Sequence, residues 1–384
     1  MKRVAGLVVV GIAIVAIAAW LTLRPARRIP SSDAVNPPVA ATPPDPYPEH
    51  PDVVLEAQLK AIMSRAPARC GVVAKHLGNG AIARVNPDER IPLLSVVKLP
   101  VAIVVLDGVD QGRWSLSTPI TLLPHDMHPR GMLGDRYPRG GGPVTLYRLL
   151  DLMIRFSDNT AADALMRVVG GPSAVTAWLE RHDIHDLRVD RTERNLGNDW
   201  YGLAPGSDTL GSAEEIRELR ARVPGAVHDS AARAMLLDPR DTGTAAACVY
   251  LLERLWRRSL LSEAMTDTLQ SILARCKTAP DRLPGLLPKG TPVARKTGTG
   301  GTSGGVTVAI NDVGVIRLPN GDNVAIAVLI GESRGSMGRA EKLIARVART
   351  VFDAWSNPDF TGPGEETPAR NRPQPASMPE HTGR

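Results

Sequence analysis

Ser95 and Lys98 are the first residues whose types and spacing could support catalysis. They lie three residues apart where a helix is predicted to begin, so their side chains would stack on one helix face. A serine at a helix N-terminus gains from the helix dipole and from free N–H groups when its oxygen attacks a carbonyl carbon. A partly buried lysine with a lowered pKa can accept the hydroxyl proton. This spacing is common by chance, and on its own a structural role is the simpler interpretation.

Two later motifs change that interpretation. Ser157-Asp158-Asn159 follows an apolar helix and opens another, and Lys296-Thr297-Gly298-Thr299 stands just before the C-terminal strands. Together with Ser95 and Lys98, their order and context resemble the class A β-lactamases, in the superfamily of serine β-lactamases and penicillin-binding proteins. The resemblance covers roughly residues 53–356.

The resemblance implies catalytic roles for the matching residues. Ser95 is expected to be the acylated nucleophile and Lys98 its proton partner, while Ser157 passes a proton to the lactam nitrogen. Glu193 stands in a segment similar to the one that precedes the family's water-activating glutamate; a solvated surface glutamate is the alternative. The expected catalytic set is Ser95, Lys98, Ser157, Glu193 and Lys296.

The same resemblance implies a set of substrate-binding residues. Asn159 is expected to bind the side-chain amide of the substrate, and Thr297 to hold the substrate carboxylate with Lys296. The main-chain N–H groups of Ser95 and Thr299 are expected to form the oxyanion hole. Arg282 stands at one of two places where relatives supply an arginine for the carboxylate, although a surface role is the alternative. The full expected set is Asn159, Thr297, Gly298, Thr299 and Arg282.

These residues predict a serine hydrolase that opens β-lactam rings through an acyl-Ser95 intermediate, hydrolysed by water that Glu193 activates. The first alternative is a penicillin-binding D-alanyl-D-alanine carboxypeptidase, or a slow acyl-enzyme former, on the same fold. The second is a tethered binding protein that keeps the fold without the reaction.

Two departures from the family pattern concern the segment after Glu193. Relatives usually have an asparagine four residues after this glutamate, where this chain has Gly197. Relatives also close the loop soon afterwards at an aspartate, whereas the matching Asp241 comes much later, which implies a long insertion within about residues 197–239. Part of the insertion, residues 212–222, is predicted to be helical, with Ser212 as its cap and Glu215 three residues later.

Hydrophobic periodicity predicts the elements that must position these residues. Strand patterns occur near both ends of the body and helical patterns between them, so we predict an α/β (α+β) fold. Its five-stranded antiparallel sheet is built from both chain ends and flanked by helices, with an all-helical subdomain. The predicted helices cover residues 53–66, 97–109, 145–156, 161–169, 173–181 and 339–355, and the predicted strands lie in a hairpin over 71–85 and at 306–310, 314–318 and 324–330.

Composition excludes several classes of protein. The formal net charge of +6 comes mostly from the first 28 residues, which leaves acidic and basic residues almost equal in number in the body. With only 4% aromatic residues, the chain has neither the basic stripe nor the stacking surfaces typical of nucleic-acid binding. No nucleotide-binding loop or zinc spacing is present, so we expect no cofactor and no metal.

The three cysteines are too few for a disulfide scaffold. Cys248 and Cys276 could pair if their two predicted helices were antiparallel, and burial of free thiols is the alternative.

The chain ends are predicted to lie outside the catalytic domain. Residues 4–23 carry no charge, which is enough to span a bilayer, so the protein is expected to be exported. It would then be anchored in the inner membrane facing the periplasm, or periplasmic if the segment is cleaved. A monomer that acts on a small β-lactam is expected. The predicted segments are 1–24 (anchor), 25–52 (Pro-rich linker), 53–356 (catalytic domain) and 357–384 (disordered tail).

Overall fold

The computed structural model describes residues 48–66, 68–206 and 212–356. The predicted anchor, nearly all of the predicted linker and the predicted tail lie outside these ranges. Within them, no helix combines the length and the apolar character needed to cross a bilayer.

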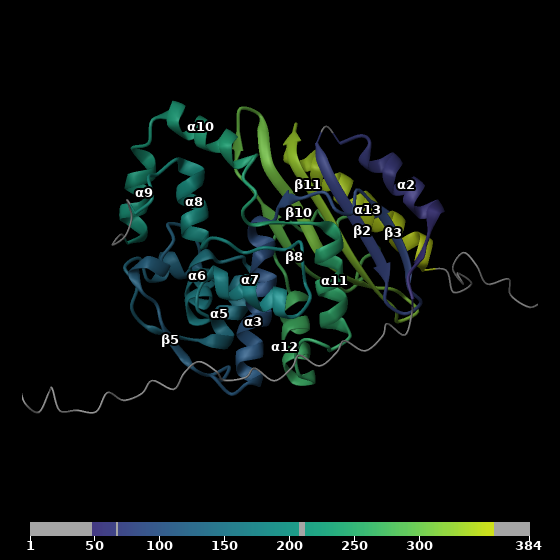
Figure 1. Cartoon of the computed structure of the whole chain (residues 1–384), viewed down its shortest axis with the longest axis horizontal. Helices are drawn as coiled ribbons and strands as arrows, with labels where there is room; N and C mark the ends of the chain where they lie inside the picture. Colours follow the sequence, from purple (N-terminus) through teal and green to yellow (C-terminus); the bar gives the residue numbers. More distant parts are fainter. Residues whose placement is uncertain (1–47, 67, 207–211, 357–384) are drawn as a thin grey trace, which may run out of the picture. The chain divides into compact units, whose positions relative to one another are not determined.

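One sheet carries strands from both ends of the body, in the order β1-β3-β2-β11-β10-β8, with β9 paired to β10 (Figure 1). The five longest strands pair antiparallel, which confirms a five-stranded antiparallel sheet built from both ends of the body, although β8 was not among the predicted strands. The two-residue β1, parallel to β3, and the two-residue β9 extend it to seven strands. The strands are β1 (His50–Pro51), β2 (Arg69–His76), β3 (Ala81–Val85), β8 (Val293–Thr299), β9 (Thr302–Ser303), β10 (Val306–Arg317) and β11 (Asn323–Arg334).

The prediction of two separate strands at 306–310 and 314–318 is wrong, because β10 runs through both without a break. Asn311 and Asp312 have the polar character of turn residues, yet both are fully buried in mid-strand. Asn311 donates its side-chain amide to the main-chain carbonyls of Pro92 (2.8 Å) and Leu93 (3.2 Å). Asp312 accepts a hydrogen bond from Arg295 (2.7 Å). Burial of Asn311 is tolerated because its amide has partners, and Asp312 is held through Oδ2 alone, since its Oδ1 has no hydrogen-bond partner among the described residues.

Helices cover both faces of the sheet. On one face α2 (Val53–Met63) packs with α13 (Met337–Trp355), and on the other α11 (Ala245–Trp256) contacts β2, β10 and β11 (Figure 1). Alternate residues of β11 therefore enter two different hydrophobic cores: Ala327 and Leu329 face α11, while Ile326 and Val328 face α13. Such a strand is apolar throughout, because successive side chains point to opposite faces.

The helical subdomain surrounds α3, in which ten of thirteen residues are buried. A helix that is apolar on all sides is expected at the centre of a domain. Its helices are η1 (Leu94–Val97), α3 (Lys98–Asp110), η2 (Pro124–Asp126), α4 (Met132–Arg136), α5 (Leu146–Arg155), α6 (Asn159–Val168), α7 (Pro172–Arg181), α8 (Glu193–Tyr201), α9 (Ala213–Ala221), α10 (Gly225–Met235) and α12 (Glu263–Leu273). Two short strand pairs complete it, β4 (Ile91–Pro92) with β7 (Thr242–Gly243) and β5 (Pro119–Thr121) with β6 (Pro143–Thr145).

All three cysteines are free thiols, so a pairing of Cys248 with Cys276 is wrong. Cys248 faces the core from the first turn of α11, where burial raises its pKa to about 12. Cys276 follows α12 and contacts the Thr278 hydroxyl instead (3.3 Å). Burial of apolar thiols therefore explains Cys248 without a bridge.

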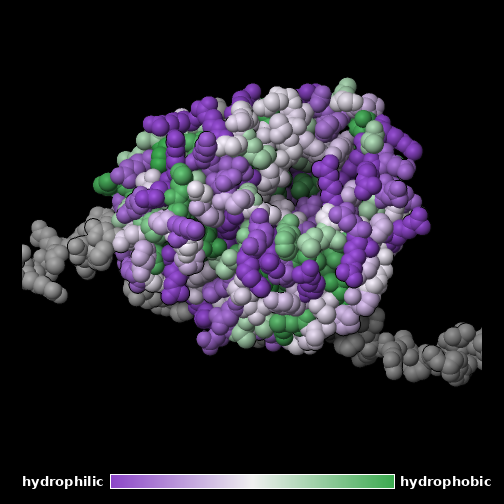
Figure 2. All heavy atoms as spheres, turned by 180° about the vertical axis from the view of Figure 1, so that it is seen from behind, coloured by the Kyte–Doolittle hydropathy of each residue, from purple (hydrophilic) through white to green (hydrophobic). Residues whose placement is uncertain are grey.

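The molecular surface on the side opposite to Figure 1 mixes hydrophilic residues with small hydrophobic patches (Figure 2). Scattered exposed apolar side chains of this kind are normal for a globular domain. The predicted monomer remains a prediction.

Asp52 joins the two helices that cover the outer face of the sheet. Its carboxylate caps α2 by accepting from Leu55 N (3.0 Å), and it also accepts from Trp355 Nε1 on α13 (3.0 Å). We predict that Asp52→Ala lowers the free energy of unfolding by about 2–3 kcal/mol, because a cap is lost and a buried indole N–H loses its acceptor. Denaturant titration checks this, with the exposed Lys60→Ala on the same helix as a near-neutral control. A loss no larger than that of the control would contradict this role for Asp52.

Candidate active site

Lys98, the first residue of α3, is the centre of the candidate site. Its side chain is fully buried, and its Nζ donates to Ser95 Oγ (2.9 Å), Ser157 Oγ (3.1 Å), Ser157 O (2.8 Å) and Asn159 Oδ1 (2.6 Å). Glu193 Oε1 lies 3.3 Å from the same nitrogen. A buried ammonium group is stable only when such acceptors surround it. The structure thus brings together four of the five predicted catalytic residues at one nitrogen atom.

Two residues in the segments that contact Lys98 have left-handed backbone conformations, which are costly for residues other than glycine. Leu94 (φ 52°) precedes the serine of η1, and Ser157 (φ 58°) stands between α5 and α6. Such strain persists only where surrounding contacts hold it. At Ser157 those contacts include both its main-chain oxygen and its hydroxyl, each bonded to Lys98.

Lys296 on β8 brings a second buried amino group to Ser157. Its Nζ donates to Ser157 Oγ (3.1 Å) and to Thr297 O (2.8 Å). Burial, with the nearby charge of Lys98, lowers the pKa of Lys296 to about 7. The Ser157 hydroxyl therefore lies between two amino groups, a position from which it can pass a proton.

Asp163 holds the helix that begins with Glu193. Its Oδ1 accepts from Glu193 N (2.7 Å), and its Oδ2 accepts from Arg194 N (3.0 Å) and contacts His128 Nε2 (2.8 Å). A carboxylate at a helix N-terminus satisfies free N–H groups and favours the helix dipole. Sequence reasoning missed this role, although Asp163 follows Asn159 by four residues and so shares its helix face.

The loop that carries Glu193 closes at Asp241, at the predicted position. Asp241 Oδ1 accepts from the main-chain N of Asp190 (2.6 Å) and of Arg191 (3.1 Å), and its Oδ2 pairs with Arg191 Nε (2.6 Å). The predicted insertion forms two helices before this closure. The prediction for residues 212–222 is confirmed by α9, whose capping box joins Ser212 and Glu215; α10 was not predicted.

Arg282 lies behind β8 with its guanidinium almost fully buried. It donates to Gly298 O (3.0 Å), Asn311 O (3.0 Å) and Thr299 Oγ1 (2.7 Å), and burial lowers its pKa. The structure therefore places Arg282 against two of the predicted binding residues of β8. Its direct contact with substrate stays a prediction.

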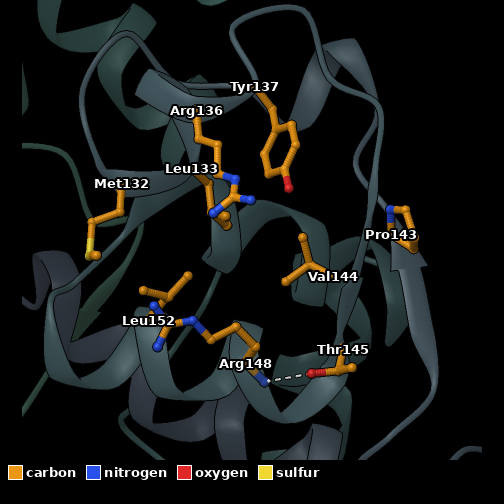
Figure 3. A pocket seen from close by; sticks show the side chains of 9 residues that line it. All are labelled: Met132, Leu133, Arg136, Tyr137, Pro143, Val144, Thr145, Arg148 and Leu152. Carbon is orange, nitrogen blue, oxygen red and sulfur yellow. Dashed lines mark hydrogen bonds between the residues drawn. The ribbon is translucent and has the colours of Figure 1, made fainter.

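Tyr137 lines a separate pocket of about 330 Å³. Figure 3 shows Arg136 and Tyr137 pointing into this pocket. Its lining residues Leu133 and Leu152 both bond to Asp158, through Leu133 N to Asp158 Oδ2 (3.1 Å) and Asp158 N to Leu152 O (3.2 Å). The pocket therefore adjoins the Ser157-Asp158-Asn159 segment.

Metal binding was not expected from the sequence. In the part of the chain that the structure describes, histidine, cysteine and carboxylate side chains form no group of three or more that could hold a metal ion.

Comparison with known proteins places this geometry in a family. The model of the beta-lactamase enzyme family matches residues 54–355. Beta-lactamase VEB-1 of Pseudomonas aeruginosa is 28% identical, over 79% of this chain and 91% of the relative. Extended-spectrum beta-lactamase PER-1 of the same organism is 29% identical, over 78% of this chain and 86% of the relative.

Solved structures agree with this result. A beta-lactamase from Chitinophaga pinensis DSM 2588 superposes with a TM-score of 0.67 at 27% identity, covering 78% of this chain and 99% of that one. An ancestral class A beta-lactamase gives a TM-score of 0.64 at 31% identity, covering 78% and 100%. The family model matches most of this chain. The chain therefore belongs to the beta-lactamase enzyme family, in its class A branch.

Proposed function

We propose that this protein is a serine hydrolase that opens β-lactam rings through an acyl-Ser95 intermediate. The observation that carries the proposal is the position of Lys98 Nζ, 2.9 Å from Ser95 Oγ and 3.3 Å from Glu193 Oε1. One nitrogen thus links a nucleophile to a buried carboxylate, as expected when both act on the same carbonyl carbon.

Acylation uses Ser95, Lys98 and Ser157. Lys98 first loses one proton to solvent, and its Nζ then takes the proton of Ser95 Oγ as this oxygen bonds to the lactam carbonyl carbon. The C–N bond then breaks, and the nitrogen receives a proton from Ser157 Oγ, which Lys98 re-protonates across 3.1 Å. General acid–base steps of this kind require hydrogen-bond distances between the groups.

The oxyanion hole is formed by the main-chain N–H groups of Ser95 and Thr299. Support comes from Gly298, where an added Cβ would lie 2.3 Å from Leu93 O. Only glycine allows β8 to approach the segment before Ser95 this closely, and this close approach supports the proposal that the two N–H groups point to one place. Preorganised donors of this kind stabilise the charge that develops in the transition state.

Substrate binding uses the edge of β8 and the start of α6. Asn159 Oδ1 accepts from Lys98 Nζ, which leaves the Asn159 Nδ2 group to donate to the carbonyl oxygen of the substrate's side-chain amide. Lys296 and Thr297 hold the substrate carboxylate, and Arg282 orients the hydroxyl of Thr299.

Deacylation uses Glu193. Its buried Oε1 pairs with Lys98 Nζ at 3.3 Å but accepts no hydrogen bond that meets the usual geometry from the described residues, so a lone pair remains available for a proton of water. Glu193 takes a proton from the water as the water oxygen attacks the ester carbon. The bond between this carbon and Ser95 Oγ then breaks, and Ser95 Oγ receives the proton of the Glu193 carboxyl through Lys98 Nζ (3.3 and 2.9 Å). A carboxylate in this position favours a hydrolase over the carboxypeptidase-like alternative, in which acyl transfer would not depend on Glu193.

We further propose that the protein is exported, with residues 1–24 as an anchor, 25–52 as a linker, 53–356 as the catalytic domain and 357–384 as a tail. The uncharged run at residues 4–23 supports export.

Turnover of a chromogenic cephalosporin tests the proposed reaction. The full-length protein should hydrolyse it continuously, whereas Glu193→Ala should release about one equivalent of product per enzyme and keep a covalent adduct, because acylation does not need the carboxylate. Absorbance and intact-protein mass spectrometry measure both, with Ser95→Ala as the inactive control. A single burst from the unaltered protein would favour the carboxypeptidase-like alternative, and normal turnover by Glu193→Ala would place the deacylating group elsewhere.

The lowered pKa of Lys296 predicts a pH dependence of substrate capture. Below about pH 7 Lys296 is an ammonium group that attracts the substrate carboxylate, and above it the charge is lost. For a penicillin, kcat/KM should therefore fall as the pH rises through about 7, and kcat should fall at higher pH because the bound carboxylate stabilises the ammonium. The penicillin methyl ester, which lacks that carboxylate, is the matched control. Identical pH profiles of kcat/KM for the acid and the ester between pH 6 and 9 would contradict this role of Lys296.

A further inference from the structure

Gly197 stands in the middle of α8, one helical turn after Glu193 and on the same face. Glycine weakens a helix, and α8 has only nine residues. The backbone of Gly197 is not in the left-handed region that favours glycine. Packing, rather than backbone conformation, therefore accounts for a glycine at this position.

The space for a side chain at position 197 is filled by Arg220 of α9. An added Cβ on Gly197 would lie 2.4 Å from Arg220 Nη2 and 3.0 Å from its Cζ. This Nη2 donates to Asn198 Oδ1 (3.0 Å) and to Arg194 O (3.4 Å), and Cζ lies 5.2 Å from the ring centre of Tyr201. One guanidinium group thus contacts residues along most of α8.

Arg220 projects from a helix that is itself fixed. The capping box orders the start of α9, and Ala213 N donates to Pro138 O (3.1 Å). Ile216 is fully buried, and Arg217 donates to Pro129 O (3.0 Å). These contacts fix the position of α9, and therefore the position of Arg220 relative to α8.

The second helix of the insertion extends this support to the strand side of the site. His228 of α10 stacks on Tyr201 (5.1 Å between ring centres) and meets Trp200 edge-on (5.3 Å). Asp229 accepts from Ser303 Oγ of β9 (2.8 Å). In Figure 1, α9 stands beside α8 and α10 runs above it, so the C-terminal half of α8 is held by the insertion while Asp163 holds its N-terminus.

We propose that Arg220 is a positioning residue for hydrolysis of the acyl-enzyme: its guanidinium replaces the missing side chain at position 197 and fixes the helix that carries Glu193. The proposal rests on the proposed function. Ser95, Lys98, Ser157 and Lys296 lie on other elements, so Arg220 acts on deacylation and leaves acylation intact.

Three variants of the full-length protein test this: Arg220→Ala, Gly197→Ala and the double variant. Stopped-flow absorbance gives the acylation rate with a chromogenic cephalosporin, and mass spectrometry gives the decay of the Ser95 adduct. Each single variant should deacylate about 10- to 100-fold more slowly, with acylation within about threefold of the unaltered protein. The double variant should be no slower than the slower single variant, because both changes remove the same guanidinium from the same place.

Two controls separate positioning from stability. Arg222→Ala removes an arginine from the end of the same helix whose side chain is 75% exposed, and it should hydrolyse normally. Gly197→Ala should have a higher melting temperature than Arg220→Ala, because alanine favours the helix. It should nevertheless deacylate slowly.

Three results would overturn the proposal: normal deacylation in both single variants, multiplied losses in the double variant, or equal losses of acylation and deacylation. Failure of the unaltered protein to hydrolyse any β-lactam would instead refute the proposed function. It would also refute the role of Arg220, which depends on that function.

Discussion

The buried ammonium of Lys98 is the interaction on which the rest of the site depends. Removing a charged amino group from water costs several kcal/mol unless acceptors replace the lost hydration. Here the acceptors come from three other parts of the chain: η1 supplies Ser95, the junction of α5 and α6 supplies Ser157 and Asn159, and α8 supplies Glu193. The stability of the folded helical subdomain and the alignment of the reacting groups therefore have one physical cause.

The surrounding elements can be understood as supports for that arrangement. The apolar α3 fixes Lys98 in the centre of the subdomain, and the close approach at Gly298 sets β8 against the segment before Ser95. The loop that carries Glu193 is closed at Asp241 and capped by Asp163. Asp241 and Asp163 satisfy buried polar groups while they hold this loop, so alignment and folding do not oppose one another there.

The sequence was informative where function depends on residue type and local spacing. Helix α9 was predictable because a capping box is a local signal, and the motif residues were predictable because the resemblance supplies their order. Contacts between residues that meet only in the folded chain could not be predicted from the sequence. Asn311 looked like a turn residue because its acceptors lie on another segment, and Asp163 caps a helix that begins 30 residues later. The place of Arg220 against Gly197 likewise depends on how the insertion folds.

The most direct test of the account is the site and rate of acylation by a penicillin, measured by peptide mass spectrometry. The account predicts an adduct on the peptide that contains Ser95, its absence in Ser95→Ala, and acylation at least about 100-fold slower in Lys98→Ala, since a positioned general base contributes this much. Circular dichroism of each variant provides the control for folding. An adduct on another peptide, or a folded Lys98→Ala variant that acylates at the normal rate, would contradict the central role of Lys98.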